Sequence, residues 1–305
     1  MRAMILALVL ALAAGPAAAA GPQQPSEPAH PSEPWMVLPP TPTLPQPVES
    51  GLAPVNGIRI WYASFGKRVP GEAPVLLLHG GLANANYWGN QVRALAPHHR
   101  VIVMDSRGHG RTTRNTKPYG YDLMASDVLA LLDYLKVEKV ALVGWSDGAI
   151  IGLDIAMKHP ERLTRLFAFA ANYDPTGVAD SSQSRIVNAY IARAGKEYET
   201  LSATPREYQS FVAQITHMWN SQPHWTRDDF AKIHVPVWIV DGDHDEMITP
   251  DQPRTMFNWI KGARLLIEPG VSHFAFLQAP EQFNADVARF LDEGRAVKKT
   301  AKTKR

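Results

Sequence analysis

The 305-residue sequence contains no cysteine, so neither a disulfide framework nor a cysteine-linked lipid anchor can form. It also lacks internal repeats, and no charge of one sign dominates, because the formal net charge is only +2. The body has no basic stripe interleaved with aromatic residues, which argues against a nucleic-acid partner. A chain without disulfides depends on its hydrophobic core. The content of 45% hydrophobic and 20% charged residues is that of an ordinary globular protein.

Residues 1–20 have the three parts of a secretory signal peptide. Arg2 supplies a positive start, residues 3–14 form an apolar run, and residues 17–20 are four alanines that offer small-residue cleavage sites. The alternative is an N-terminal membrane anchor, but the run is short for a span of about 20 residues. We therefore expect a periplasmic or secreted protein without stable membrane insertion after cleavage.

Two further segments are predicted to lie outside the folded body. Residues 21–54 are predicted to be a linker, because ten prolines between Pro22 and Pro47 favour extended, polyproline-like backbone. Its apolar island, residues 35–38, either docks on the body or stays mobile. Residues 294–305 form a basic tail whose last ten residues carry five basic side chains without an acid, and we expect it to be solvated and frayed. The alternative is a contact with anionic lipid or nucleic acid.

From Val55 the chain alternates short apolar runs with stretches of helical periodicity. The runs predicted to be strands are residues 58–65, 75–78, 101–104, 139–143, 166–170, 237–240 and 265–267. Such alternation predicts an α/β fold with a mainly parallel, doubly wound sheet over residues 55–293. Residues of about 173–233 break the pattern with helical stretches and aromatics, and we interpret them as a helical lid insertion.

One junction between strand and helix has the pattern of a nucleophile elbow, Gly144-Trp145-Ser146-Asp147-Gly148. The backbone must reverse sharply there, so only small flanking residues fit. The serine oxygen is then held at the carboxyl edge of the sheet, above a helix N-terminus whose N–H groups face an anion.

A serine nucleophile needs a base, and the base needs an orienting acid. His273 is the candidate base, because it follows the last predicted strand and precedes the last helix. Asp245 is the first candidate for the acid, since it lies beyond the turn that follows the penultimate strand and can therefore point towards the histidine. Asp243 ranks second and Asp174 third. Asp241 and Asp243 are also open to a purely structural interpretation, because they lie closer to the strand and in the turn.

Developing negative charge on a substrate oxygen requires N–H donors. The first candidate donor is the backbone of Asp147, the residue after the nucleophile. The second is Gly81 in the loop His79-Gly80-Gly81, with Leu82 in reserve. The alternative for this loop is a mere turn.

These motifs resemble those of the α/β-hydrolase fold superfamily in type, order and strand context over residues of about 55–291. They are His79-Gly80-Gly81, Asp105-x-Arg107-Gly108-x-Gly110, Gly144-x-Ser146-x-Gly148, Gly242-x-x-Asp245 and Gly270-x-x-His273. The resemblance implies a catalytic triad of Ser146, Asp245 and His273, with Asp105 and Arg107 bracing their loop.

The elbow is also similar to that of valacyclovir hydrolase-like esterases, in which the acid beside the nucleophile is implicated in holding a substrate ammonium group. In this chain that residue is Asp147. A carboxylate there favours a cationic substrate, whereas the alternative is a brace for the helix N-terminus. Trp145 and Trp219 are further candidates for substrate binding, although aromatics of the insertion at helical spacing more often serve packing.

The sequence thus predicts an exported serine hydrolase that cleaves small carboxylic esters without a metal or organic cofactor. The alternatives on the same fold are an amidase or aminopeptidase, a C–C bond hydrolase, and a ligand-binding member that does not turn over.

Overall fold

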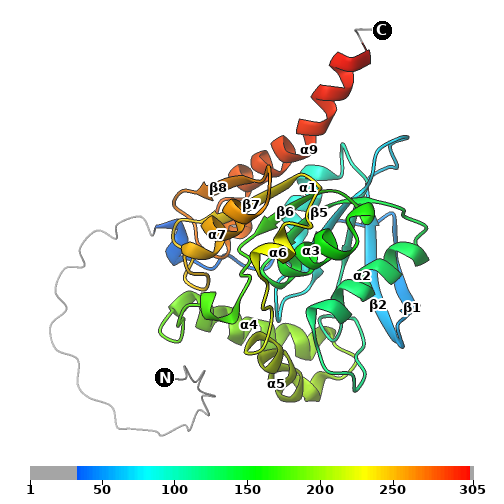
Figure 1. Ribbon diagram of the computed structural model, residues 1–305. Coiled ribbons are helices and arrows are strands. Elements are labelled where there is room, and N and C mark those ends of the chain that lie inside the picture. Colours follow the sequence, from blue (N-terminus) through cyan, green and yellow to red (C-terminus); the bar gives the residue numbers. More distant parts are fainter. Residues whose placement is uncertain (1–32, 303–305) are drawn as a thin grey trace, which may run out of the picture.

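The structure, a computed structural model, describes residues 33–302 and contains one eight-stranded sheet (Figure 1). The spatial order of the strands is β1-β2-β4-β3-β5-β6-β7-β8, with β1 and β2 antiparallel and the others parallel. Their bounds are β1 Glu49–Val55, β2 Ile58–Phe65, β3 Val75–Leu78, β4 Val101–Met104, β5 Val140–Trp145, β6 Leu163–Phe169, β7 Val237–Gly242 and β8 Arg264–Glu268. The predicted α/β fold with a mainly parallel sheet is confirmed.

Helices cover both faces of this sheet, because the central strands are apolar on both sides. In β5, Val140 and Leu142 join the core beneath α2 and α3, whereas Ala141 and Val143 join the core beneath α1, α8 and α9. The helices are α1 Gly89–Leu95, α2 Tyr121–Tyr134, α3 Asp147–Lys158, α4 Arg185–Leu201, α5 Tyr208–Trp219, α6 Arg227–Phe230, α7 Asp251–Trp259, α8 Ala275–Gln278 and α9 Pro280–Lys302. None of the helices within the described range combines the length and hydropathy of a membrane span.

The first strand corrects the predicted end of the linker at residue 54. Glu49–Val55 forms β1 and pairs with β2 across a two-residue turn. Asn56 and Gly57 both have positive φ, 49° and 73°, as a tight hairpin turn requires. Pro54 is tolerated because β1 is an edge strand. The Asn-Gly signal therefore implied a strand on both of its sides.

The residues before β1 also pack on the body, and we call residues 33–48 the N-terminal arm. Trp35 stacks on His244 with ring centroids 3.9 Å apart. The guanidinium of Arg193 in α4 donates to the carbonyls of Leu38 and Pro39 at 3.1 and 2.6 Å. Within the arm, Pro34–Met36 forms a short 3-10 helix and residues 37–47 form no regular element, and the apolar island is docked. Residues 1–32, which include the predicted signal peptide, lie outside the described residues.

The C-terminal helix is longer than predicted. We expected it to end near residue 291 and a frayed tail from residue 294, but α9 continues to Lys302. Alanine, lysine and arginine, which dominate this segment, are among the strongest helix formers, and no proline interrupts it. Figure 1 shows the end of α9 pointing away from the sheet.

A helical insertion, residues 170–236, separates β6 from β7 and carries α4, α5 and α6. In Figure 1, α4 and α5 lie together at the bottom of the molecule, apart from the helices that flank the sheet. The sequence predicted no strand in this segment, and the structure has no strand between β6 and β7. Its buried residues, among them Tyr190 and Phe211, continue the two cores of the sheet.

Candidate active site

Ser146 occupies a strained backbone position between β5 and α3. Its φ of 53° and ψ of −120° place a non-glycine residue where side chains are seldom found. The flanking glycines make this turn possible, because a Cβ at Gly144 would collide with the backbone of Gly148. A Cβ at Gly148 would in turn collide with the carbonyl of Leu78. The geometry is that of a nucleophile elbow, with the serine at the carboxyl edge of the sheet.

His273 and Asp245 meet at the same edge, from the loops that follow β8 and β7. Nδ1 of His273 lies 2.8 Å from Oδ2 of Asp245, and both side chains are buried. The other oxygen of Asp245 accepts hydrogen bonds from the N–H groups of Met247 and Ile248 at 2.7 and 2.8 Å. Asp245 is therefore held by its own loop with one oxygen presented to the imidazole.

The two lower-ranked acids lie elsewhere. Oδ1 of Asp243 accepts hydrogen bonds from the N–H groups of Gly270 and Val271 at 2.8 and 3.3 Å. It thereby ties the loop that carries His273 without touching the imidazole. Asp174 lies 2.6 Å from Nδ1 of His224 in the helical insertion. Of the three acids, Asp245 is the one that the structure places against the base.

Both neighbours of Ser146 face the imidazole. The ring of Trp145 lies 5.9 Å from that of His273, centroid to centroid, and the charge of Asp147 acts on His273. On the opposite side, a Cβ built on Gly80 would lie 3.0 Å from Cβ of Ser146. Ser146 thus lies against the glycine loop after β3, and its neighbour Trp145 lies against His273 of the base loop.

The imidazole is surrounded by acids that favour its charged form. Burial opposes the charge, but Asp245, Glu246 and Asp147 prevail and raise the pKa of His273 above its ordinary value. Burial likewise opposes ionisation of Asp245, yet the imidazole charge and hydrogen bonds hold the pKa of Asp245 below its usual range. An imidazolium formed by taking a serine proton is therefore stabilised here.

The predicted donors for an oxyanion lie beside the elbow. Asp147 is the first residue of α3, so its N–H has no partner within the helix. The carbonyl of Gly81 accepts a hydrogen bond from the hydroxyl of Tyr190 in α4. Leu82, the reserve donor, has a positive φ of 63°. Nδ1 of His79 donates to the carbonyl of Gly80 at 2.7 Å, which further orients the loop.

The side chain of Asp147 does not cap α3 but points to the helical insertion. Its carboxylate accepts hydrogen bonds from Nε1 of Trp219 at 3.0 Å and from the hydroxyl of Tyr121 at 2.8 Å. A Cβ built on Gly81 would lie 2.7 Å from its Oδ2. Burial raises the pKa of Asp147 to about 6, against the effect of these two donors and of His273.

The two tryptophans proposed for substrate binding differ in position. Trp219 is half-buried and contacts Asp147 at the border of the site. Trp145 has an exposed fraction of 1% and packs among Tyr87, Phe274 and Phe276. The structure thus places this ring in the aromatic core beside His273, where it supports the imidazole, and not at the substrate as predicted.

The loop after β4 is braced as the family resemblance implied. Asp105 accepts hydrogen bonds from the N–H groups of Ala85 and Arg111, both at 2.7 Å. Arg107 forms a buried ion pair with Asp127 of α2 at 2.6 Å. Nothing in the sequence spacing marks Asp127, Tyr121 or Tyr190 as partners of these motifs.

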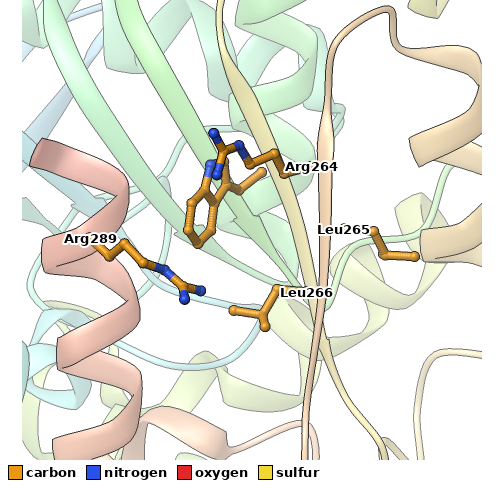
Figure 2. Close-up of a pocket in the computed structure, with 5 residues that line it drawn as sticks. Arg264, Leu265, Leu266 and Arg289 are labelled. Atoms are coloured by element: carbon orange, nitrogen blue, oxygen red, sulfur yellow. The ribbon is translucent and has the colours of Figure 1, made fainter. Parts of the chain in front are cut away.

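A pocket of about 190 Å³ lies away from this site, next to β8 and α9 (Figure 2). It is lined by Trp238, Arg264, Leu265, Leu266 and Arg289. Trp238 and Arg264 stand at the amino ends of β7 and β8, whereas Ser146, Asp245 and His273 follow the carboxyl ends. Ligands of open α/β sheets bind beyond the carboxyl ends, so this pocket is separate from the candidate active site.

Comparison with known proteins supports the same fold. The family model of the alpha/beta hydrolase fold matches residues 73–199. Serine hydrolase BPHL from Homo sapiens is 27% identical over 257 residues, covering 80% of this chain and 87% of the relative. Rhodomycin D methylesterase DnrP from Streptomyces peucetius is 32% identical over 186 residues, covering 59% of this chain and 58% of the relative.

Solved structures give the same result. The enol-lactonase from Burkholderia xenovorans LB400 matches with a TM-score of 0.63 and 25% identity, covering 80% of this chain and 100% of the lactonase. The meta-cleavage product hydrolase CumD from Pseudomonas fluorescens IP01 has a TM-score of 0.69, covering 81% and 98%, but its 21% identity shows the fold alone. The chain has the α/β-hydrolase fold, and its hydrolase relatives support an enzyme of that type.

Proposed function

We propose that this protein is a serine hydrolase that cleaves carboxylic esters of small molecules. Oγ of Ser146 attacks the ester carbonyl while His273 takes the serine proton, and the N–H groups of Gly81 and Asp147 stabilise the oxyanion. The imidazolium then gives the proton to the departing alcohol, which leaves an acyl-enzyme. Water, activated by the same imidazole, releases the acid and restores the serine.

The observation that carries this proposal is the pairing of His273 with Asp245 at 2.8 Å beside a strained elbow serine. An imidazole whose Nδ1 faces a buried carboxylate has its Nε2 left for the serine proton. Structural histidines do not need such a carboxylate, and a structural serine does not need φ of 53°. The relatives named as a serine hydrolase and a methylesterase agree with ester cleavage.

A fluorophosphonate probe tests the nucleophile directly. We expect the wild-type protein to be labelled, and labelling to be lost in Ser146→Ala, which removes the attacking oxygen. His273→Ala should slow labelling strongly, because the serine then has no base. A folded wild-type protein that is not labelled would favour the alternative of a ligand-binding member without turnover.

We further infer that Asp147 favours substrates with an α-amino group. Its carboxylate lies against the backbone of Gly81, where the acyl part of an ester would sit, and it accepts hydrogen bonds from the neutral donors Trp219 and Tyr121. A bound ammonium group would also favour the ionised carboxylate. Asp147→Asn should therefore lower kcat/KM for α-amino esters more than for neutral esters of equal size. Equal losses on both would remove this inference.

The remaining alternatives differ in the bond that is cleaved. A panel of p-nitrophenyl esters of graded chain length, with and without an α-amino group, separates ester specificity from the others. Matched anilides report amidase or aminopeptidase activity, and meta-cleavage-type diketones report C–C bond hydrolysis. We expect the esters to be turned over fastest, because an ester carbonyl is more reactive than that of a matched anilide towards the same serine nucleophile.

We also propose that residues 1–20 direct export and are then removed, which leaves a periplasmic or secreted enzyme. The support is the sequence pattern of positive start, apolar run and alanines. Mass spectrometry of the protein purified from a fractionated bacterial host gives the mature N-terminus. A chain that keeps Met1 and stays in the membrane fraction would favour the N-terminal anchor instead.

A further inference from the structure

Behind the candidate triad lies a second buried acid that the mechanism above does not use. Asp241 is the last residue but one of β7 and has an exposed fraction of 2%. Its carboxyl group lies within hydrogen-bonding reach of that of Asp245, the acid that faces His273. Two buried carboxyl groups in contact cannot both be ionised without strong repulsion, so one of them keeps a proton and donates it to the other.

The other hydrogen bonds decide which acid keeps the proton. Asp245 receives two backbone N–H groups, from Met247 and Ile248, and faces the imidazole of His273. Asp241 receives one backbone N–H, that of Gly242, at 2.9 Å. Donors stabilise the ionised form of a carboxyl group. Asp245 therefore carries the charge, and the proton belongs to Asp241.

We propose that Asp241 is a neutral carboxylic acid at the working pH and positions Asp245 by donating an O–H hydrogen bond to it. The chain of contacts then runs from Asp241 through Asp245 to His273, the base proposed for Ser146. Asp241 is a positioning residue, because it acts only through Asp245. This inference rests on the proposed function for its catalytic meaning, but the location of the proton is a property of the folded protein itself.

The donated hydrogen bond has two expected effects. It fixes the rotation of the Asp245 carboxylate, so that Oδ2 stays directed at Nδ1 of His273. It also draws negative charge away from the imidazole, which keeps His273 from becoming too basic to be neutral near pH 7. A third acid, Glu246, lies nearby, and its Oε2 accepts from the backbone N–H of His273 at 3.4 Å. Glu246 acts electrostatically on Asp241 and on His273.

One more buried acid borders this region and offers a matched control. Glu268 of β8, paired with Gly242 in the sheet, has an exposed fraction of 0%. Burial and the charge of Asp286 raise the pKa of Glu268 to about 8. Like Asp241 it should be protonated at neutral pH, but neither of its carboxyl oxygens has a hydrogen-bond partner in the part of the chain that the structure describes.

Infrared difference spectroscopy on the full protein at pH 7 tests the location of the proton. A protonated carboxylic acid has a C=O stretching band that is well separated from the bands of a carboxylate. The difference between wild type and Asp241→Asn should contain this band. Glu268→Gln should remove a different band of the same kind, which shows that the measurement detects buried neutral acids. A difference spectrum for Asp241→Asn with carboxylate bands alone would overturn the proposal.

The acid limb of the pH profile of kcat/KM tests the positioning role. Asparagine keeps a neutral donor to Asp245, so Asp241→Asn should leave this limb unmoved. Leucine removes the donor and leaves more negative charge on Asp245, so Asp241→Leu should raise the apparent pKa of this limb by about one unit. If Asp241 were instead ionised, Asp241→Asn would remove a negative charge near the imidazole and lower the limb by about one unit. Glu268→Gln should not move it.

The outcomes separate this inference from the proposed function. If no ester is cleaved, NMR titration of the His273 imidazole in the same variants replaces the kinetic profile, and the infrared band still locates the proton. If Asp241→Leu does not fold, the sign of the shift in Asp241→Asn decides by itself. An unmoved imidazole in a folded Asp241→Leu variant would overturn the positioning role and leave a structural acid.

Discussion

At the carboxyl edge of the sheet, short loops carry Ser146, Asp245 and His273 directly from strand ends. The helical insertion reaches the same site with two long side chains, Tyr190 on Gly81 and Trp219 on Asp147. The backbone of the sheet therefore positions the reacting groups, whereas the insertion contacts the groups that would face the substrate oxygen and the acyl part. We therefore expect substitutions at the sheet edge to reduce kcat most. Substitutions in the insertion should reduce kcat only modestly and should change substrate selectivity more.

The strongest test of the sheet-edge side is Asp245→Asn. An asparagine would keep the size of the side chain but would not stabilise an imidazolium, so kcat on the best p-nitrophenyl ester should fall by about 10⁴-fold. The matched variant is Asp243→Asn, since Asp243 binds only the backbone of the base loop and His244. Equal losses in the two variants would mean that the orienting acid is assigned to the wrong residue.

The stability of the sheet edge should also depend on pH through Glu268. Because its pKa is raised to about 8 in the folded protein, the folded state binds this proton more tightly than the unfolded state. The resulting stability is fully present at acidic pH, below the ordinary pKa of a glutamate, and is lost as pH rises towards 8. The slope is at most about 1.4 kcal/mol per pH unit. Denaturant melts from pH 5 to 8 should show a flatter dependence in Glu268→Gln, and parallel curves would contradict this assignment.

On the insertion side, Tyr190→Phe removes the hydrogen bond to the carbonyl of Gly81 and leaves the ring in place. Loss of this contact should loosen the peptide that donates to the oxyanion and reduce kcat by about tenfold, with little change in KM. Tyr198→Phe is the matched control on the same helix, because Tyr198 is also buried but its hydroxyl contacts Thr204. If both variants lose activity equally, the effect arises from packing of α4 and not from Gly81.

The smallest expected effect concerns the N-terminal arm, which joins the insertion to the body. Arg193→Ala removes two hydrogen bonds to arm carbonyls and should lower the free energy of unfolding by about 1 kcal/mol. Lys196→Ala, an exposed basic residue on the same helix, serves as the comparison. The midpoint of urea unfolding is the measurement. No difference between the two variants would show that the arm contributes nothing through Arg193.

The difference between the sheet edge and the insertion also explains which parts of the site could be predicted from the sequence. Ser146 follows from a local pattern, because a glycine-flanked serine after an apolar strand has few other structural solutions. His273 and Asp245 follow from their positions in the loops after the last two strands, in the chain order that the elbow predicts. In contrast, Tyr190 and Tyr121 could not be found, since their hydroxyls meet Gly81 and Asp147 only after α4 and α2 have packed.

Two predictions failed for reasons of the same kind. The proline-rich segment was expected to stay outside the fold up to residue 54, but the Asn56-Gly57 turn closes a hairpin that brings β1 onto β2. Trp145 was expected at the substrate, yet alternation along β5 directs its side chain into the core with Ala141 and Val143. Hydrophobic periodicity identifies a buried strand, but it does not predict whether the last side chain of that strand faces the core or the active site.

The amino-acid sequence by itself determined the α/β class, the elbow and the chain order of nucleophile, acid and base, because each depends on backbone conformation over a few neighbouring residues. Only the tertiary structure decided that Asp241 lies within hydrogen-bonding reach of Asp245, that Asp147 binds Trp219, and that the N-terminal arm lies against α4. Two of these contacts join residues that are distant in sequence, and the contact between Asp241 and Asp245 depends on the direction of their side chains. The energy of each contact also depends on how deeply it is buried, and a local sequence pattern does not predict that.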